Sequence, residues 1–66
     1  MENRIIHFRQ QFDLTQDDLA SETGVSRQTI ISLEKGRYNP SINLAFKISR
    51  LFHCSIEDVF IYKEEK

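Results

Sequence analysis

Cysteine, histidine, glycine and proline are all scarce in this sequence, and tryptophan is absent. The single cysteine, Cys54, excludes a disulfide within the chain, and together with His7 and His53 it lacks the spacing of a zinc site. No stretch reaches the ~18 apolar residues of a membrane-spanning helix, and the first residues do not form the apolar run of a secretory signal. We therefore expect a cytoplasmic, reducing setting, with no metal, no cofactor and no membrane contact.

The chain is also short, at 66 residues. A domain of this size buries only ~60% of the surface that its unfolded form exposes, so little interior is left for a substrate cleft. No set of nucleophile, base and orienting residue is visible in the sequence. We therefore expect one domain over residues 1–66 that is not an enzyme, with self-association as a source of further stability.

The formal net charge is −1, which by itself argues against binding to nucleic acid. The charges are unevenly distributed along the chain, however. Residues 26–50 carry five basic residues and one acidic residue, whereas the rest of the chain carries four basic and nine acidic residues. A chain that is polarised in this way can present one positive face despite its acidic total.

The spacing of apolar and helix-capping residues predicts an all-α domain of five short helices. The first helix is indicated by an apolar stripe, made of Ile5, Phe8 and Phe12. A capping serine or threonine marks the start of each later helix: Thr15, Ser26, Ser41 and Ser55. The last segment has an alternative, because residues 59–62 are β-branched or aromatic and could extend as a short strand instead.

Residues 16–35 form the most informative stretch, which reads as two helices joined by a turn. Ala20 is small enough for the helices to cross closely, and Gly24 permits a positive φ at the turn. The outward face of the second helix is polar, with Arg27, Gln28 and Ser32. This is the helix-turn-helix arrangement, in which the second helix lies in the DNA major groove. The alternative is an ordinary solvated helix face.

The sequence resembles the helix-turn-helix domain of Cro proteins, lambdoid phage repressors and small bacterial regulators of the XRE family. The resemblance covers roughly residues 4–61 and is carried by these segments: TQ at 15–16, LA at 19–20, GVSRQTI at 24–30, EKG at 34–36 and YNPS at 38–41. It implies a five-helix lambda-repressor-like fold. It also implies a sequence-specific double-stranded DNA-binding regulator, a repressor that binds an inverted-repeat operator as a homodimer. Ile31 departs from the pattern, because it is apolar near the side that faces the groove.

The resemblance assigns roles to individual positions. Four residues match the base-reading positions: Arg27, Gln28, Ser32 and Thr29. Six match positions that contact DNA phosphates: Gln16, Lys35, Arg37, Tyr38, Asn39 and Ser41. Arg9 and Glu34 match an internal salt bridge, so Glu34 would face inward and not repel DNA. Without the resemblance, Lys35 and Arg37 would be read as capping a helix C-terminus, and Arg9 with Glu34 as an exposed pair of little consequence.

The apolar residues near the C-terminus exceed what one small core needs. We therefore expect a dimer contact within residues 44–62, from Phe46, Leu51, Phe52, Phe60 and Tyr62. The same apolar excess and the acidic net charge also suit an alternative function. In that alternative the fold serves as an antitoxin or anti-repressor that binds a partner protein.

Overall fold

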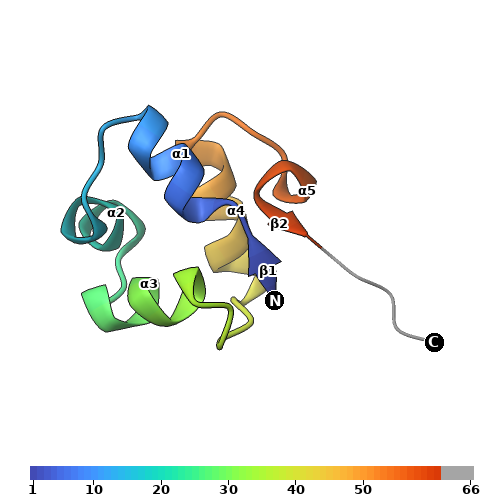
Figure 1. Cartoon of the computed structure of the whole chain (residues 1–66), viewed down its shortest axis with the longest axis horizontal. Coiled ribbons are helices and arrows are strands. Elements are labelled where there is room, and N and C mark those ends of the chain that lie inside the picture. Colours follow the sequence, from blue (N-terminus) through green and yellow to red (C-terminus); the bar gives the residue numbers. More distant parts are fainter. Residues whose placement is uncertain (62–66) are drawn as a thin grey trace.

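The computed structural model describes residues 1–61 of the chain (Figure 1). Its elements in chain order are β1 (Glu2–Asn3), α1 (Ile5–Gln11), α2 (Gln16–Thr23), α3 (Arg27–Glu34), α4 (Ile42–Leu51), α5 (Ile56–Val59) and β2 (Phe60–Ile61). Five helices thus make up most of the described chain, and the expectation of a helical domain is confirmed.

Four of the helices begin at the capping residues that the sequence marks. Thr15 accepts a hydrogen bond from the backbone N–H of Asp18, and the Asp18 carboxylate accepts one from the backbone N–H of Thr15. Ser55 begins α5 with the same reciprocal box, while Ser26 and Ser41 each cap through their hydroxyl alone. Each cap satisfies backbone donors that the first turn of a helix leaves without partners.

The end of α2 is set by Gly24, which has a φ of +74°. Its backbone N–H donates to the carbonyl of Ala20, which closes the last turn of the helix. An L side chain rarely adopts this left-handed conformation, and glycine does so without strain. The chain therefore turns sharply after Thr23 and enters α3 within a few residues.

The core is built from all five helices. Its fully buried apolar side chains are Ile5, Leu19, Ile30, Leu33, Ile48, Phe52 and Val59. Leu19 of α2 and Ile30 and Leu33 of α3 belong to one buried cluster, which holds the two helices against each other. Burying a side chain of this size stabilises the fold by roughly 1.5–3 kcal/mol, so the angle between the two helices is fixed from inside.

The ends of the described chain meet in a two-stranded antiparallel ribbon. Glu2 lies opposite Ile61, and Asn3 lies opposite Phe60. The sequence allows either helix or strand over residues 59–62; the structure has helix up to Val59 and strand over Phe60–Ile61. The sequence does not predict the N-terminal strand. Its partner lies at the other end of the chain, so no local pattern points to it.

Two of the residues expected at a dimer surface are instead part of the core, and that expectation is wrong for them. Phe52 is 1% exposed and Phe60 is 6% exposed. The ring of Phe8 in α1 stacks on Phe52, with 5.5 Å between ring centroids, and β1 pairs along Phe60. Leu51 is half-buried and packs against the core, whereas Phe46 is 50% exposed. Tyr62 lies outside the described residues.

Candidate nucleic-acid interface

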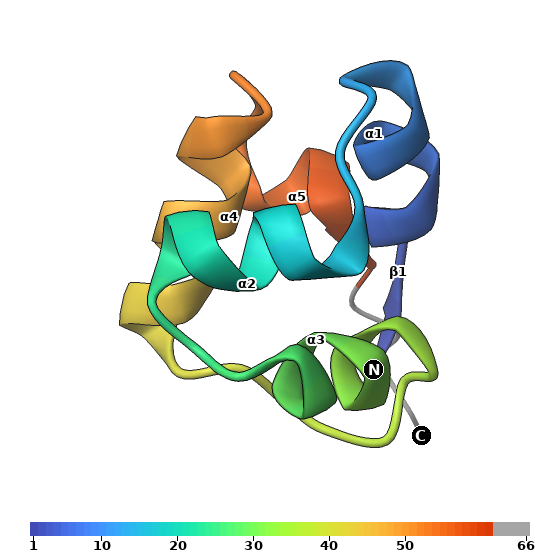
Figure 2. The same ribbon diagram turned by 90° about the vertical axis from the view of Figure 1, so that its left-hand side faces the viewer.

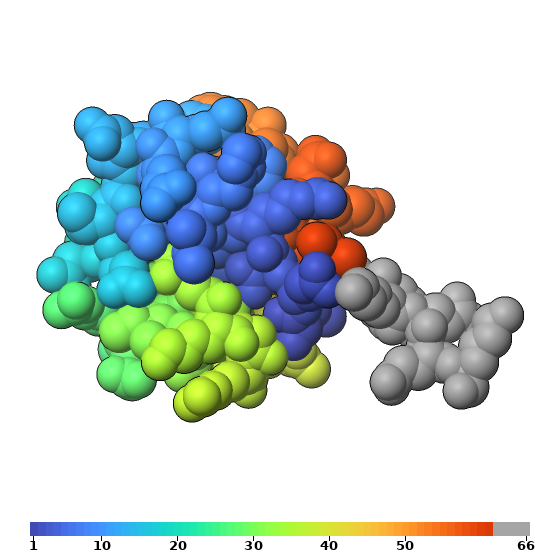
Figure 3. Space-filling view, viewed as in Figure 1, coloured from blue at the N-terminus to red at the C-terminus, as the bar shows by residue number. Residues whose placement is uncertain are grey.

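Helices α2 and α3 are joined by a short turn and cross at an angle, with α3 at the edge of the molecule (Figure 2). The loop that follows α3 runs along the same edge. In the space-filling view, α3 and this loop form the lower rim of the molecule and α1 does not cover them (Figure 3). The outer side of α3 is thus open to a large ligand.

The open side of α3 presents polar side chains. Arg27 and Gln28 are exposed, and Thr29 and Ser32 are half-buried. The sequence-predicted base-reading residues therefore all come from one helix, and the described chain leaves them accessible. Ile31, the apolar residue next to this face in the sequence, is half-buried.

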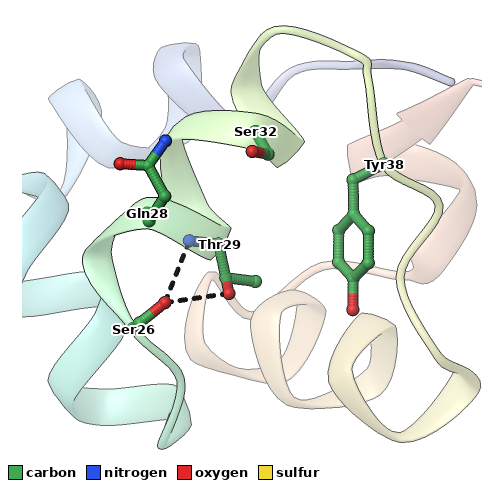
Figure 4. A pocket seen from close by; sticks show the side chains of 5 residues that line it. All are labelled: Ser26, Gln28, Thr29, Ser32 and Tyr38. Atoms are coloured by element: carbon green, nitrogen blue, oxygen red, sulfur yellow. Dashed lines mark hydrogen bonds between the residues drawn. The ribbon is translucent and has the colours of Figure 1, made fainter.

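A shallow hollow of about 240 Å³ lies between α3 and the loop that follows it. Figure 4 shows Tyr38 on one side of the hollow, facing Thr29 across it, with Gln28 pointing away from the tyrosine. The hydroxyl of Ser26 lies 3.2 Å from the backbone nitrogen of Thr29 and 3.0 Å from its hydroxyl. These bonds fix the first turn of α3, which carries Gln28 and Thr29 on one side of the hollow.

The predicted phosphate contacts lie mostly in the loop after α3. Lys35, Arg37 and Asn39 are exposed, and Tyr38 is 43% exposed. Ser41 is exposed, and its hydroxyl oxygen accepts a hydrogen bond from the backbone N–H of Leu44 at the start of α4. Ser41 thus stands at the start of α4, where the first turn leaves backbone N–H groups without partners inside the helix. The N-terminus of a helix favours the binding of an anion such as a DNA phosphate.

An internal network ties α1 and α2 to the end of α3. The Nε of Arg9 lies 2.8 Å from Oε2 of Glu34, and the amide of Gln16 donates to Oε1 of the same carboxylate at 2.8 Å. Arg9 also donates to the carbonyl of Leu14. The Glu34 side chain is 4% exposed, so the one acidic residue of the basic segment faces inward. Gln16, expected at a phosphate, uses its N–H₂ group within this network.

Sequence reasoning missed the part that Asn3 takes at the far end of α3. Its side-chain amide donates to the carbonyl of Leu33 at 2.6 Å, and its side-chain oxygen accepts from the backbone N–H of Ile5 at 3.1 Å. The N-terminal strand thus holds the C-terminal end of α3 and the start of α1 together. An asparagine before a helical stripe signals a cap, but nothing in the sequence indicates the contact to Leu33.

Away from α3, the described residues include both histidines and the one cysteine of the sequence. Residues 1–61 hold no group of three histidine, cysteine or acidic side chains placed to bind a metal ion. None of their helices has the length and apolar character to cross a bilayer. His7 and His53 are exposed and lie against phenylalanine rings, and the half-buried Cys54 thiol donates to a backbone carbonyl.

The comparison with known sequences agrees with this geometry. The sequence model of a family described as helix-turn-helix matches residues 5–59. An uncharacterized HTH-type transcriptional regulator of Archaeoglobus fulgidus is 54% identical over 66 residues, which is 100% of this chain and 93% of that protein. Another, of Methanocaldococcus jannaschii, is 53% identical over the full length of both chains.

Solved structures show the same fold. The clp gene regulator ClgR from Corynebacterium glutamicum superposes with a TM-score of 0.75 at 28% identity, over 82% of this chain and 57% of that one. This chain thus spans little more than half of ClgR. The restriction-modification controller protein C.AhdI from Aeromonas hydrophila gives a TM-score of 0.77 at 24% identity, over 86% of each chain. A fold of the lambda-repressor type, a family match over most of the chain and full-length relatives place the chain in the XRE-type helix-turn-helix family of transcriptional regulators.

Proposed function

We propose that this protein is a repressor that binds double-stranded DNA sequence-specifically, as a homodimer on an inverted-repeat operator. The observation that carries the proposal is the open polar face of α3, whose Arg27 and Gln28 are exposed while the opposite side of the helix is fixed in the core. The regulator names of the full-length relatives support it. Repression follows from occupying a promoter, and the cytoplasm is the setting in which the protein would meet DNA.

The four side chains on α3 read base edges in this proposal. An arginine makes paired hydrogen bonds to O6 and N7 of guanine, and a glutamine does so to N6 and N7 of adenine. Arg27 and Gln28 are therefore the main discriminating residues, each contributing about 1–3 kcal/mol against the wrong base. Thr29 and Ser32 are shorter and line the hollow beside Tyr38, where they would meet a base edge or its sugar.

The residues of the loop after α3 bind the DNA backbone in this proposal. Lys35 and Arg37 supply charge, and Tyr38 and Asn39 supply hydrogen bonds. The start of α4 adds the hydroxyl of Ser41 and the backbone N–H of Ile42. Gln16 contributes mainly by holding Glu34, because its amide group is already bonded there. Backbone contacts set the register of the protein on DNA and the dependence of affinity on salt, but do not select a sequence.

Dimerisation is proposed through the exposed side of α4, within residues 44–62. Phe46 is 50% exposed there, and the neighbouring Ile42 is 64% exposed. Leu51 is half-buried at the end of the same helix. Exposed apolar side chains of this size often mark a protein–protein contact, and two copies of the chain could bury them against each other. Two α3 helices would then enter successive major grooves ~34–36 Å apart, which is why the operator should be an inverted repeat.

The same exposed side chains favour a second candidate function, binding to a partner protein as an antitoxin or anti-repressor. In that case the apolar side of α4 would be covered by another protein. Sedimentation of the purified chain separates the two candidates. A dimer at micromolar concentration supports the homodimer, whereas a stable monomer leaves the apolar side of α4 to a different protein.

The proposal is tested by selecting duplexes from a random-sequence pool with the purified protein. We expect one inverted-repeat sequence to be enriched, and binding titrations at fixed salt to give at least ~10³-fold tighter binding to it than to a scrambled duplex of the same composition. A half-site duplex should bind more weakly than the full repeat. Equal affinity for selected and scrambled duplexes would contradict the proposal.

A further inference from the structure

Asp17 and Arg27 lie side by side at the starts of α2 and α3. Oδ1 of Asp17 is 3.7 Å from Nε of Arg27, and the two side chains are 73% and 61% exposed. A surface ion pair this open adds little to folding stability, because water screens it and both side chains must be held in place. The contact therefore acts mainly on the position of the Arg27 side chain. Arg27 is the first residue of the helix proposed to read DNA.

The nitrogen of Arg27 that lies nearest to Asp17 is Nε and not a terminal nitrogen. The terminal nitrogens of Arg27, Nη1 and Nη2, make no hydrogen bond within residues 1–61. A guanidinium carries five N–H donors in one plane, and a paired contact to guanine needs only two of them. A carboxylate on the Nε side can thus hold the arginine, while the terminal nitrogens Nη1 and Nη2 remain available to contact O6 and N7 of a guanine.

We propose that Asp17 is a positioning residue for sequence readout, which holds Arg27 by its Nε side and aims the terminal nitrogens at a guanine. This inference rests on the proposed function. The ion pair persists in the complex, where displacement of water strengthens it. An arginine that is already held loses less side-chain freedom on binding, which raises the affinity for the correct site by roughly two- to twelvefold.

Asp17 has the opposite effect on unspecific binding. Its carboxylate is exposed and would lie near the phosphates of any bound duplex, so it repels all DNA alike. The residue therefore lowers affinity for a scrambled duplex while it supports the contact to guanine. This combination, weaker general binding with stronger discrimination, distinguishes a positioning role from a purely electrostatic one.

The test is a set of titrations of the full chain with three duplexes at fixed salt. These are the selected operator, the operator with one guanine at a time replaced by 7-deazaguanine, and the scrambled duplex. Asp17→Asn keeps the size of the side chain and removes its charge. Glu22→Gln is the matched control, because it removes an exposed carboxylate from the same helix. Arg27→Lys supplies a background without an Nε–H or a planar fork.

We expect Asp17→Asn to bind scrambled DNA more tightly and to lower the ratio of operator to scrambled affinity by roughly two- to twelvefold. It should also lose less affinity than the wild type on 7-deazaguanine at one operator position. Glu22→Gln should keep the wild-type ratio. In the Arg27→Lys background, Asp17→Asn should leave the ratio unchanged.

The inference is overturned if Asp17→Asn keeps both the wild-type ratio and the wild-type loss on 7-deazaguanine, and in that case the proposed function still stands. It is also overturned if the ratio falls equally in the Arg27→Lys background, because the effect then does not pass through the arginine. Failure of the wild type to distinguish operator from scrambled duplex would overturn the proposed function itself.

Discussion

Breaking the buried Arg9–Glu34 pair is predicted to remove a large part of the stability of this fold. The Glu34 side chain is 4% exposed, and its two oxygens accept hydrogen bonds from Arg9 and Gln16. Arg9→Met keeps an apolar stem but leaves the buried carboxylate with only a neutral amide. Losing one partner of a buried pair costs ~3–5 kcal/mol. We expect the lower end, about 3 kcal/mol, because Arg9 is 17% exposed and water reaches that side of the pair.

Urea denaturation followed by circular dichroism measures this loss as a change in the free energy of unfolding. A domain of this length has about 3–10 kcal/mol in total, so the variant should be near the limit of folding, with a thermal midpoint lowered by about 12–24 °C. A variant that combines Arg9→Met with Glu34→Leu removes both charges and should recover much of the stability.

The matched control for this prediction is Arg27→Met. It removes the same charge from the exposed pair with Asp17, and should cost less than about 1 kcal/mol. If Arg9→Met and Arg27→Met unfold at the same urea concentration, then burial does not decide the strength of these pairs and the reasoning is refuted.

Three further predictions concern the turn, a cap and the exposed apolar face. Gly24→Ala should destabilise the protein by about 1 kcal/mol, seen as a lower thermal midpoint, because φ is +74° although no atom lies within 4 Å of the added Cβ; an unchanged midpoint would contradict this. The hydrogen bonds from the backbone N–H and hydroxyl of Thr15 lower the pKa of Asp18 below its ordinary value of 3.8. The stability this gives is present above that value and should fade as pH falls through the lowered pKa; urea titrations from about pH 5 to pH 2 should show a smaller fade in Thr15→Ala. Phe46→Ser should sediment as a folded monomer, whereas Phe52→Ser, which opens the core at a side chain 1% exposed, should fail to fold; a Phe46→Ser dimer would place the contact elsewhere.

The helices could be predicted from the sequence because the signals for their ends are local. The capping oxygens of Thr15, Ser26 and Ser41 accept hydrogen bonds from backbone N–H groups three residues away. Gly24 ends α2 through its own left-handed backbone conformation. Such contacts lie within a single turn, so residue type and spacing are enough to locate them. Once the start of α3 is known, the helical repeat of about 3.6 residues predicts which of its side chains form the polar face.

The parts that sequence reasoning missed depend on contacts between distant segments. Phe52 and Phe60 have the same apolar character as Phe46, and only the packing of α1 and β1 decides that the first two are buried and the third is exposed. In the same way, the bond from Asn3 to the Leu33 carbonyl joins residues 30 positions apart. Periodicity identifies an apolar stripe, but it does not reveal which neighbour covers it.

The proposed function depends most on the division of roles between α3 and the loop that follows it. Titrations of Arg27→Ala and Arg37→Ala over a range of salt concentrations, on the selected and scrambled duplexes, test this division directly. We predict that Arg27→Ala abolishes the preference for the selected duplex. Arg37→Ala should weaken binding to both duplexes alike, and should reduce the slope of log affinity against log salt by about one. Equal effects of the two substitutions on the ratio of selected to scrambled affinity would contradict the claim that α3 reads the sequence.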